Sequence, residues 1–97
     1  MVDKYEIKWT RESKDQTDKI IAYLLKNWSE KECKDFLDLL LHFEKTISLF
    51  PKTFKASSKY KGCRLGLVHK HITAVYKISY RSIIILTILD NRSEKEK

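Results

Sequence analysis

The hydrophobic pattern of this chain changes its period once, near Pro51, and that change constrains the fold more than any other feature of the sequence. Before Pro51 the apolar residues recur at helical spacing in two successive stripes. The stripes consist of Ile20, Ile21, Leu24, Leu25 and Trp28, and of Cys33, Phe36, Leu37, Leu40, Phe43, Ile47 and Phe50. After a basic loop over residues 52–61, apolar residues alternate with their neighbours as they do in strands. We therefore expect two helices followed by a group of strands.

Helix-start signals separate the two expected helices. Thr10 or Ser13 can cap the first helix, and Ser29 with Glu32 has the spacing of a capping box at the start of the second. Pro51 ends the second helix because proline cannot donate a backbone hydrogen bond. Two helices joined by so short a turn are expected to form an antiparallel hairpin.

The remaining segments favour an antiparallel sheet. Residues 5–9 alternate as a short strand that we expect at an edge, and residues 83–89 are apolar on both faces apart from Thr87, as in a central strand. Short linkers at residues 69–71 and 79–81 favour hairpins. In the strand after the basic loop we expect one face in the core and the other open. The expected core side is Cys63, Leu65 and Leu67, and the expected open side is Arg64, Gly66 and Val68. The predicted fold is α+β, in the order β-α-α-β-β-β, with the helical hairpin on one face of an antiparallel sheet.

Positive charge is concentrated in one segment of the chain. Residues 45–89 contain nine basic residues and no acidic one, whereas the formal net charge of the whole chain is +7. A segment of one sign attracts phosphate or an acidic protein partner. The alternative is a basic surface that is merely solvated.

Length and composition exclude several classes of protein. The 97 residues fit one domain, which we assign to residues 1–92, with a flexible charged tail at 93–97. No apolar run reaches the roughly 18 residues of a membrane span, and the first residues lack the apolar stretch of a signal peptide. Cys33 and Cys63 lack metal-site spacing, so we expect buried free thiols in a reducing cytoplasm. The sequence suggests no cofactor and no metal site.

The strongest candidate for a binding residue is Arg64, on the expected open face beside Gly66. A guanidinium next to a position without a side chain allows close approach of a phosphate or a carboxylate. Arg92 follows the last strand and could converge with Arg64, although a contact with Asp90 that fixes the strand end is an equal alternative. The predicted functional basic face consists of Lys59, Lys61, Arg64 and Arg92.

His69 and His71 flank the first hairpin turn and could transfer protons near neutral pH. The simpler interpretation is that both are solvated turn residues. Tyr60, Tyr76 and Tyr80 alternate with basic residues, as in many nucleic-acid binders, but the phase of Tyr76 favours the core.

A set of ordered residues resembles one protein family along nearly the whole chain. It comprises Trp9, Tyr23, Trp28, Pro51, Gly62-Cys63-Arg64, His69, Ala74-Val75-Tyr76 and Ile88-Leu89-Asp90-Asn91-Arg92. In this order the residues resemble the RelE/ParE superfamily of bacterial type II toxins. The resemblance implies a growth-inhibiting, plasmid-stabilising toxin that is neutralised by an antitoxin, whose C-terminal segment wraps the toxin. The acid-free segment suits an acidic antitoxin in a toxin–antitoxin hetero-oligomer.

The family has two branches, and the resemblance is closer to the ParE-like branch. RelE-like members cut mRNA on the ribosome with an Arg early in the strand that ends in Tyr, and with a Tyr or His near the C-terminus. Here the strand position is Thr73, and residues 93–97 contain neither Tyr nor His. ParE-like members poison DNA gyrase, and the Gly-x-Arg opening and His69 resemble theirs. We therefore expect a ParE-like toxin, and a family member whose toxicity is weak or lost is an open alternative.

Two alternatives remain open from the sequence. The first is a ribosome-dependent mRNA endonuclease in which Arg64 and Lys61 hold phosphate while His69 or His71 moves the proton. The second is a non-catalytic nucleic-acid-binding module that uses the loop at residues 52–61. None of the three interpretations involves a membrane.

Overall fold

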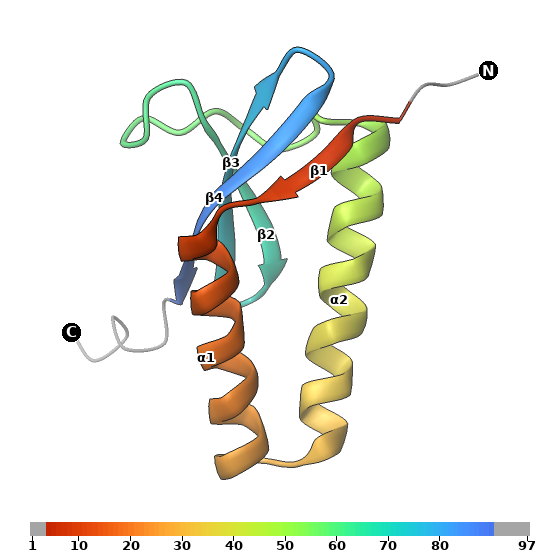
Figure 1. The fold of residues 1–97 in the computed structure, drawn as a ribbon, viewed down its shortest axis with the longest axis vertical. Coiled ribbons are helices and arrows are strands. Elements are labelled where there is room, and N and C mark those ends of the chain that lie inside the picture. The colour runs from red at the N-terminus through yellow and green to blue at the C-terminus, as the bar shows by residue number, and fades with distance from the viewer. Residues whose placement is uncertain (1–3, 91–97) are drawn as a thin grey trace.

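The computed structural model describes residues 4–90, and its elements follow the expected order (Figure 1). The elements are β1 (Glu6–Trp9), α1 (Arg11–Asn27), α2 (Glu30–Leu49), β2 (Arg64–His69), β3 (Ile72–Ser79) and β4 (Ser82–Asp90). The tail at 93–97 and Arg92 lie outside the described residues. No described helix is both long enough and apolar enough to cross a bilayer.

Side-chain caps define the two helices at the expected residues. The Thr10 hydroxyl accepts a hydrogen bond from the Ser13 backbone, and the Ser29 side chain accepts one from the Glu32 backbone. Helix α2 ends at Leu49, just before Phe50 and Pro51. The two helices form the hairpin that the sequence predicts (Figure 1).

The sheet has the strand order β1-β4-β3-β2, with β2, β3 and β4 as an antiparallel meander. Strand β1 occupies the edge beside β4, as expected, but it runs parallel to β4, so the sheet is mixed. Beyond Trp9 the Gln16 side chain continues this edge, because its oxygen accepts hydrogen bonds from the Ile88 backbone at 2.7 Å and the Thr87 hydroxyl at 2.9 Å. Helix α1 is thereby fixed to the end of β4.

The core lies between the helical hairpin and one face of the sheet. Helix α2 contributes most of the helical residues of the core, and strands β3 and β4 supply their buried apolar partners. The core consists of Ile20, Phe36, Phe43, Ile47, Val68, Ile72, Ala74, Tyr76, Ile83, Ile85 and Ile88. Cys33 and Cys63 are both buried free thiols, which confirms the prediction for these residues.

The expected facing of β2 was wrong. Gly66 and Val68 face the helices and are buried, whereas Leu67 is 58% exposed on the opposite face. Arg64 pairs with Tyr76 across the strands, and directly opposed residues share a face, so Arg64 lies on the helix-covered side. The reason is local packing, because the ring of Phe43 fills the space over Gly66. A count of apolar residues along β2 cannot reveal this contact.

Candidate functional site: a cationic end and a hairpin groove

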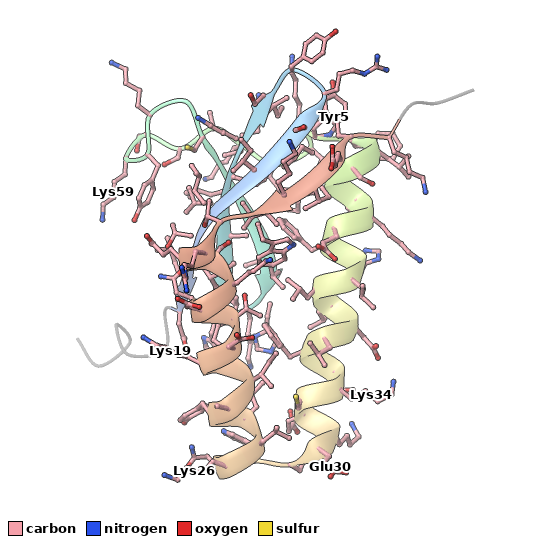
Figure 2. All side chains as sticks on the ribbon, in the orientation of Figure 1. Tyr5, Lys19, Lys26, Glu30, Lys34 and Lys59 are labelled. Atoms are coloured by element: carbon pink, nitrogen blue, oxygen red, sulfur yellow. The ribbon has the colours of Figure 1, made fainter. Side chains whose placement is uncertain are left out.

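The acid-free segment places its charges mainly at one end of the molecule. Strands β1 and β4 begin at this end, β3 finishes there, and the loop at residues 50–63 leads into β2 there (Figure 1). Eight of the nine basic residues in the acid-free segment (residues 45–89) lie at this end, and the ninth, Lys70, lies in the turn at the other end of β2. We call the eight the cationic end: Lys45, Lys52, Lys55, Lys59, Lys61, Arg64, Lys77 and Arg81. Figure 2 shows Lys59 here and Lys26, Glu30 and Lys34 at the far tip of the hairpin.

Lys59 and Lys61 are exposed in the loop that precedes β2. The Lys59 ammonium lies 5.5 Å from the centroid of the Tyr60 ring, a cation–π contact at the surface. These two predicted residues of the basic face are therefore accessible to a partner.

Arg64 holds the loop in place and is only partly exposed. Its Nη1 donates a hydrogen bond of 2.7 Å to the Phe54 carbonyl. The Tyr76 hydroxyl donates a second bond of 2.7 Å to the Pro51 carbonyl. The role of Arg64 in this geometry is therefore structural at least in part.

The Tyr76 phenol lies at the base of this loop. Burial raises its pKa above the ordinary value, and the nearby Arg64 guanidinium and the Phe54 backbone offset part of that increase. Because the neutral phenol is favoured, Tyr76 acts as a hydrogen-bond donor rather than as an ionised group.

His69 and His71 lie at the other end of β2, away from Lys61 and Arg64. The strand spans five residue steps from Arg64 to His69, which is about 16 Å. The His69 Nδ1 accepts a hydrogen bond of 3.3 Å from the His71 backbone, and the two rings are 5.9 Å apart. The arrangement that the alternative nuclease interpretation needs, with Lys61, Arg64 and a histidine around one phosphate, is therefore not formed within the described residues.

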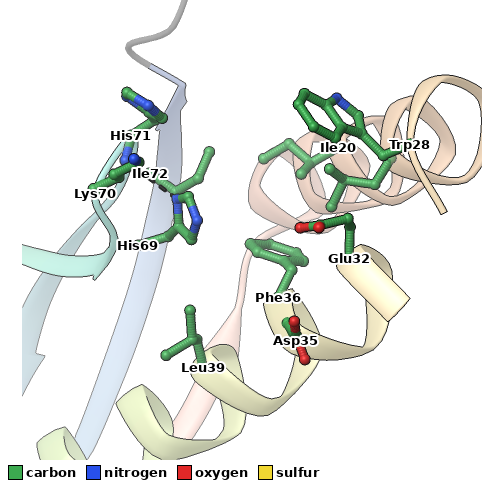
Figure 3. Close-up of a pocket in the computed structure, with 11 residues that line it drawn as sticks. Ile20, Trp28, Glu32, Asp35, Phe36, Leu39, His69, Lys70, His71 and Ile72 are labelled. Atoms are coloured by element: carbon green, nitrogen blue, oxygen red, sulfur yellow. Dashed lines mark hydrogen bonds between the residues drawn. The ribbon is translucent and has the colours of Figure 1, made fainter. Parts of the chain in front are cut away.

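The two histidines instead line a groove between the helical hairpin and the β2–β3 turn (Figure 3). The groove has a volume of about 580 Å³ and an apolar floor that includes Ile20, Phe36 and Ile72. Figure 3 shows Glu32 and Asp35 on the helix side and His69 on the strand side. Its rim therefore carries acidic groups on one side and the His69-Lys70-His71 turn on the other. Sequence reasoning missed this groove, because its lining comes from α1, α2 and the β2–β3 turn; two of its apolar residues, Leu39 and Trp28, are 39% and 63% exposed.

The described residues contain no group of three or more His, Cys, Asp or Glu placed to hold a metal ion. The open face of the sheet is also less basic than the sequence suggested. It carries paired apolar residues and threonines, such as Leu67 with Thr73 and Thr73 with Leu89. The cations therefore gather at the end of the sheet rather than across its face.

Comparison with known proteins gives matches in structure but not in sequence. No protein-family model matches the chain, and no curated protein matches its sequence. A chain of the chromosomal ParDE toxin–antitoxin system from P. aeruginosa superposes with a TM-score of 0.75 at 17% identity, over 89% of this chain and 95% of that one.

Two further solved structures are similar at lower scores. A chain of the E. coli DinJ-YafQ toxin–antitoxin complex has a TM-score of 0.58 at 10% identity, covering 93% of this chain and 96% of that one. A copper-bound mutant toxin from Helicobacter pylori has a TM-score of 0.57 at 16% identity, covering 93% of this chain and 97% of that one. The structural likeness confirms the predicted resemblance at the level of architecture: this chain has the RelE/ParE-like toxin fold.

Proposed function

We propose that this protein is the toxin of a bacterial type II toxin–antitoxin system, acting in the cytoplasm by ParE-like binding to DNA gyrase. The observation that carries the proposal is the fold, which the chain shares along most of its length with a chain of a ParDE system. The cationic end supports a binding role, because accessible charges of one sign attract an anionic target.

The separation of the histidines from the basic residues favours binding over cleavage. A general acid or base must lie within hydrogen-bonding reach of the atom that it serves, directly or through one water. His69 is about 16 Å along β2 from Arg64, too far to serve a phosphate held there. This geometry favours a toxin that acts by binding its target over a ribonuclease. Thr73, at the position where RelE-like members carry Arg, agrees with that choice.

The groove at the hairpin is the proposed docking site for the antitoxin. It offers apolar residues that a helix or an extended segment could cover, and charges of both signs at its rim. An acidic antitoxin would be drawn first by the cationic end, because complementary charge speeds encounter. Toxin and antitoxin would then form a hetero-oligomer through a surface distinct from the exposed Lys59 and Lys61.

Induced expression, with and without the neighbouring open reading frame, tests the proposal. We expect growth arrest, filamentous cells and DNA damage that a small acidic neighbouring protein relieves. Cut transcripts with an early stop in protein synthesis would instead show the mRNA endonuclease. Unaffected growth, with salt-sensitive binding to any nucleic acid, would show a non-catalytic binding module.

A further inference from the structure

A hollow at the tip of the sheet brings together two tyrosines and two cations. It is lined by Lys4, Tyr5, Tyr80 and Arg81 and has a volume of about 400 Å³. Two backbone hydrogen bonds hold its parts together: Tyr5 donates to the Ser48 carbonyl at 2.9 Å, and Glu6 donates to the Arg81 carbonyl at 3.1 Å. The start of β1 and the β3–β4 turn are thus fixed relative to each other and to the end of α2.

Tyr80 is poorly suited to its position in structural terms. Its φ angle is +57°, in the left-handed region that costs free energy for residues other than Gly, Asn and Asp. Tyr80 is 90% exposed, so side-chain packing contributes almost nothing to offset this free energy. The two-residue turn between Ser79 and Ser82 requires a positive φ at this position, where Gly, Asn or Asp is the usual residue. The turn therefore accounts for the backbone conformation, and the fold does not account for the choice of an exposed tyrosine there.

The lining groups together define the chemistry of a ligand. An exposed tyrosine ring presents a flat face on which a base can stack, and ammonium and guanidinium groups bind phosphate. None of the four lining residues is acidic. The other basic residues of the cationic end extend the positive surface. Such a surface suits a nucleic-acid strand, because the strand carries a phosphate at every nucleotide.

We propose that this hollow binds one nucleotide of a single-stranded nucleic acid, with the base stacked on Tyr80 and the adjoining phosphates held by Lys4 and Arg81. The inference goes beyond the proposed function, because it holds whatever cellular target the toxin has. An acidic protein segment would satisfy the two cations but would leave the aromatic face unused, which is why the nucleic acid fits better.

Titration of a fluorescein-labelled 12-nucleotide single strand with the full chain at low salt tests the proposal. We expect Tyr80→Asn to weaken binding roughly tenfold through loss of stacking. Tyr80→Phe should keep the affinity of the wild-type protein, because the ring is retained. Lys4→Gln and Arg81→Gln should each reduce the slope of log K against log salt by about 0.7. Tyr23→Ala and Lys26→Gln, on α1, are the matched controls and should change neither quantity.

Thermal unfolding separates a lost contact from a lost fold. Asn adopts positive φ more easily than Tyr, so Tyr80→Asn should raise Tm by about 4 °C while it weakens binding. Failure of the wild-type protein to bind the strand, or equal binding by Tyr80→Asn, would overturn the proposal. Competition by a polyglutamate peptide that still depends on Tyr80 would also overturn it, in favour of an acidic protein partner.

Discussion

The ring of Phe43 occupies the space that a side chain on Gly66 would need. A Cβ at residue 66 would lie 2.6 Å from Phe43 Cζ and 3.2 Å from Tyr76 Cε1. Phe43 also contacts the Phe54 ring, with centroids 5.6 Å apart, and the Tyr76 ring edge-on at 6.0 Å. The absence of a side chain at Gly66 therefore lets α2 approach β2 rather than opening a surface to a ligand.

Gly66→Ala should destabilise the protein by about 2 kcal/mol, because Phe43 must leave its rotamer or the strand must shift. The measurement is chemical denaturation followed by Trp fluorescence. Gly62→Asn is the control, because Gly62 has φ +80° with open space around it, and Asn tolerates that conformation. An unchanged midpoint for Gly66→Ala would contradict the packing role assigned to this glycine.

Arg64→Ala should lower the free energy of unfolding by about 1–2 kcal/mol, since it removes the charged donor to the Phe54 carbonyl. We also expect this variant to relieve growth arrest while antitoxin binding stays mostly intact, because Arg64 belongs to the cationic end. Because the same substitution lowers stability, the toxicity of the variant has to be compared with its Tm.

Lys61→Ala is the matched comparison for Arg64→Ala, because Lys61 is exposed and its loss should change stability by less than about 0.5 kcal/mol. If Arg64 contacts the target, Arg64→Ala should lose more toxicity than its drop in stability explains. Full toxicity in a folded Arg64→Ala variant would remove this residue from the functional face.

Tyr76→Phe should make the protein less sensitive to alkali. Burial raises the pKa of the Tyr76 phenol in the folded state above the usual tyrosine value of about 10. Below pH 10 both states keep the proton. Above it the unfolded chain releases the proton first, so the free energy of unfolding falls as pH rises towards the folded pKa. Tyr76→Phe removes that contribution and also the bond to the Pro51 carbonyl, at a cost of about 1 kcal/mol near neutral pH.

Urea denaturation at pH 8 and at pH 11 gives the slope of the free energy of unfolding with pH for the wild-type protein and for Tyr76→Phe. The difference between these two slopes measures the effect. Tyr80→Phe is the control, because it removes a tyrosine hydroxyl from the exposed surface rather than from the core. Identical slopes for wild type and Tyr76→Phe would show that burial of this phenol has no consequence for stability.

Local chemistry made the helices and the meander predictable from the sequence. The caps at Thr10 and Ser29 and the stop at Pro51 depend on residues close in the chain, so their signals are complete within a few positions. The hairpin turns after His69 and Ser79 are local in the same way. The parallel pairing of β1 with β4 is not local, because it joins Glu6 to Ser82 across both helices.

The candidate site was harder to predict because it depends on contacts between distant residues. The side of β2 that carries Arg64 is set by the packing of Phe43 over Gly66. The alternation along β2 favoured the opposite side, because Leu65 and Leu67 are apolar whereas Arg64 is charged. The distance between Arg64 and His69 follows from strand length and was available from the sequence. The hollow beside Tyr80 and the groove beside Leu39 both require the tertiary fold, since their residues come from separate elements.

Leu39→Lys should weaken antitoxin binding about tenfold, because it places a charge in the apolar groove where we expect the antitoxin to dock. Leu39 is 39% exposed, so the fold should tolerate the change. Leu41→Lys is the matched control, on the same helix with 58% exposure but outside the groove lining. Calorimetric titration with the cognate antitoxin measures both; equal affinities for the two variants would place the antitoxin elsewhere.

Replacement of both His69 and His71 by Gln should leave growth inhibition nearly unchanged. If the toxin acts by binding, no proton transfer limits its effect, and these histidines lie about 16 Å along β2 from the basic residues near Arg64. A nuclease that used either histidine would instead lose a factor on the order of 10²–10⁴ in rate. Growth after induction and the integrity of cellular transcripts are the two measurements. Transcript cleavage by the wild-type protein, lost together with toxicity in a folded double variant, would restore the endonuclease interpretation and contradict the binding mechanism.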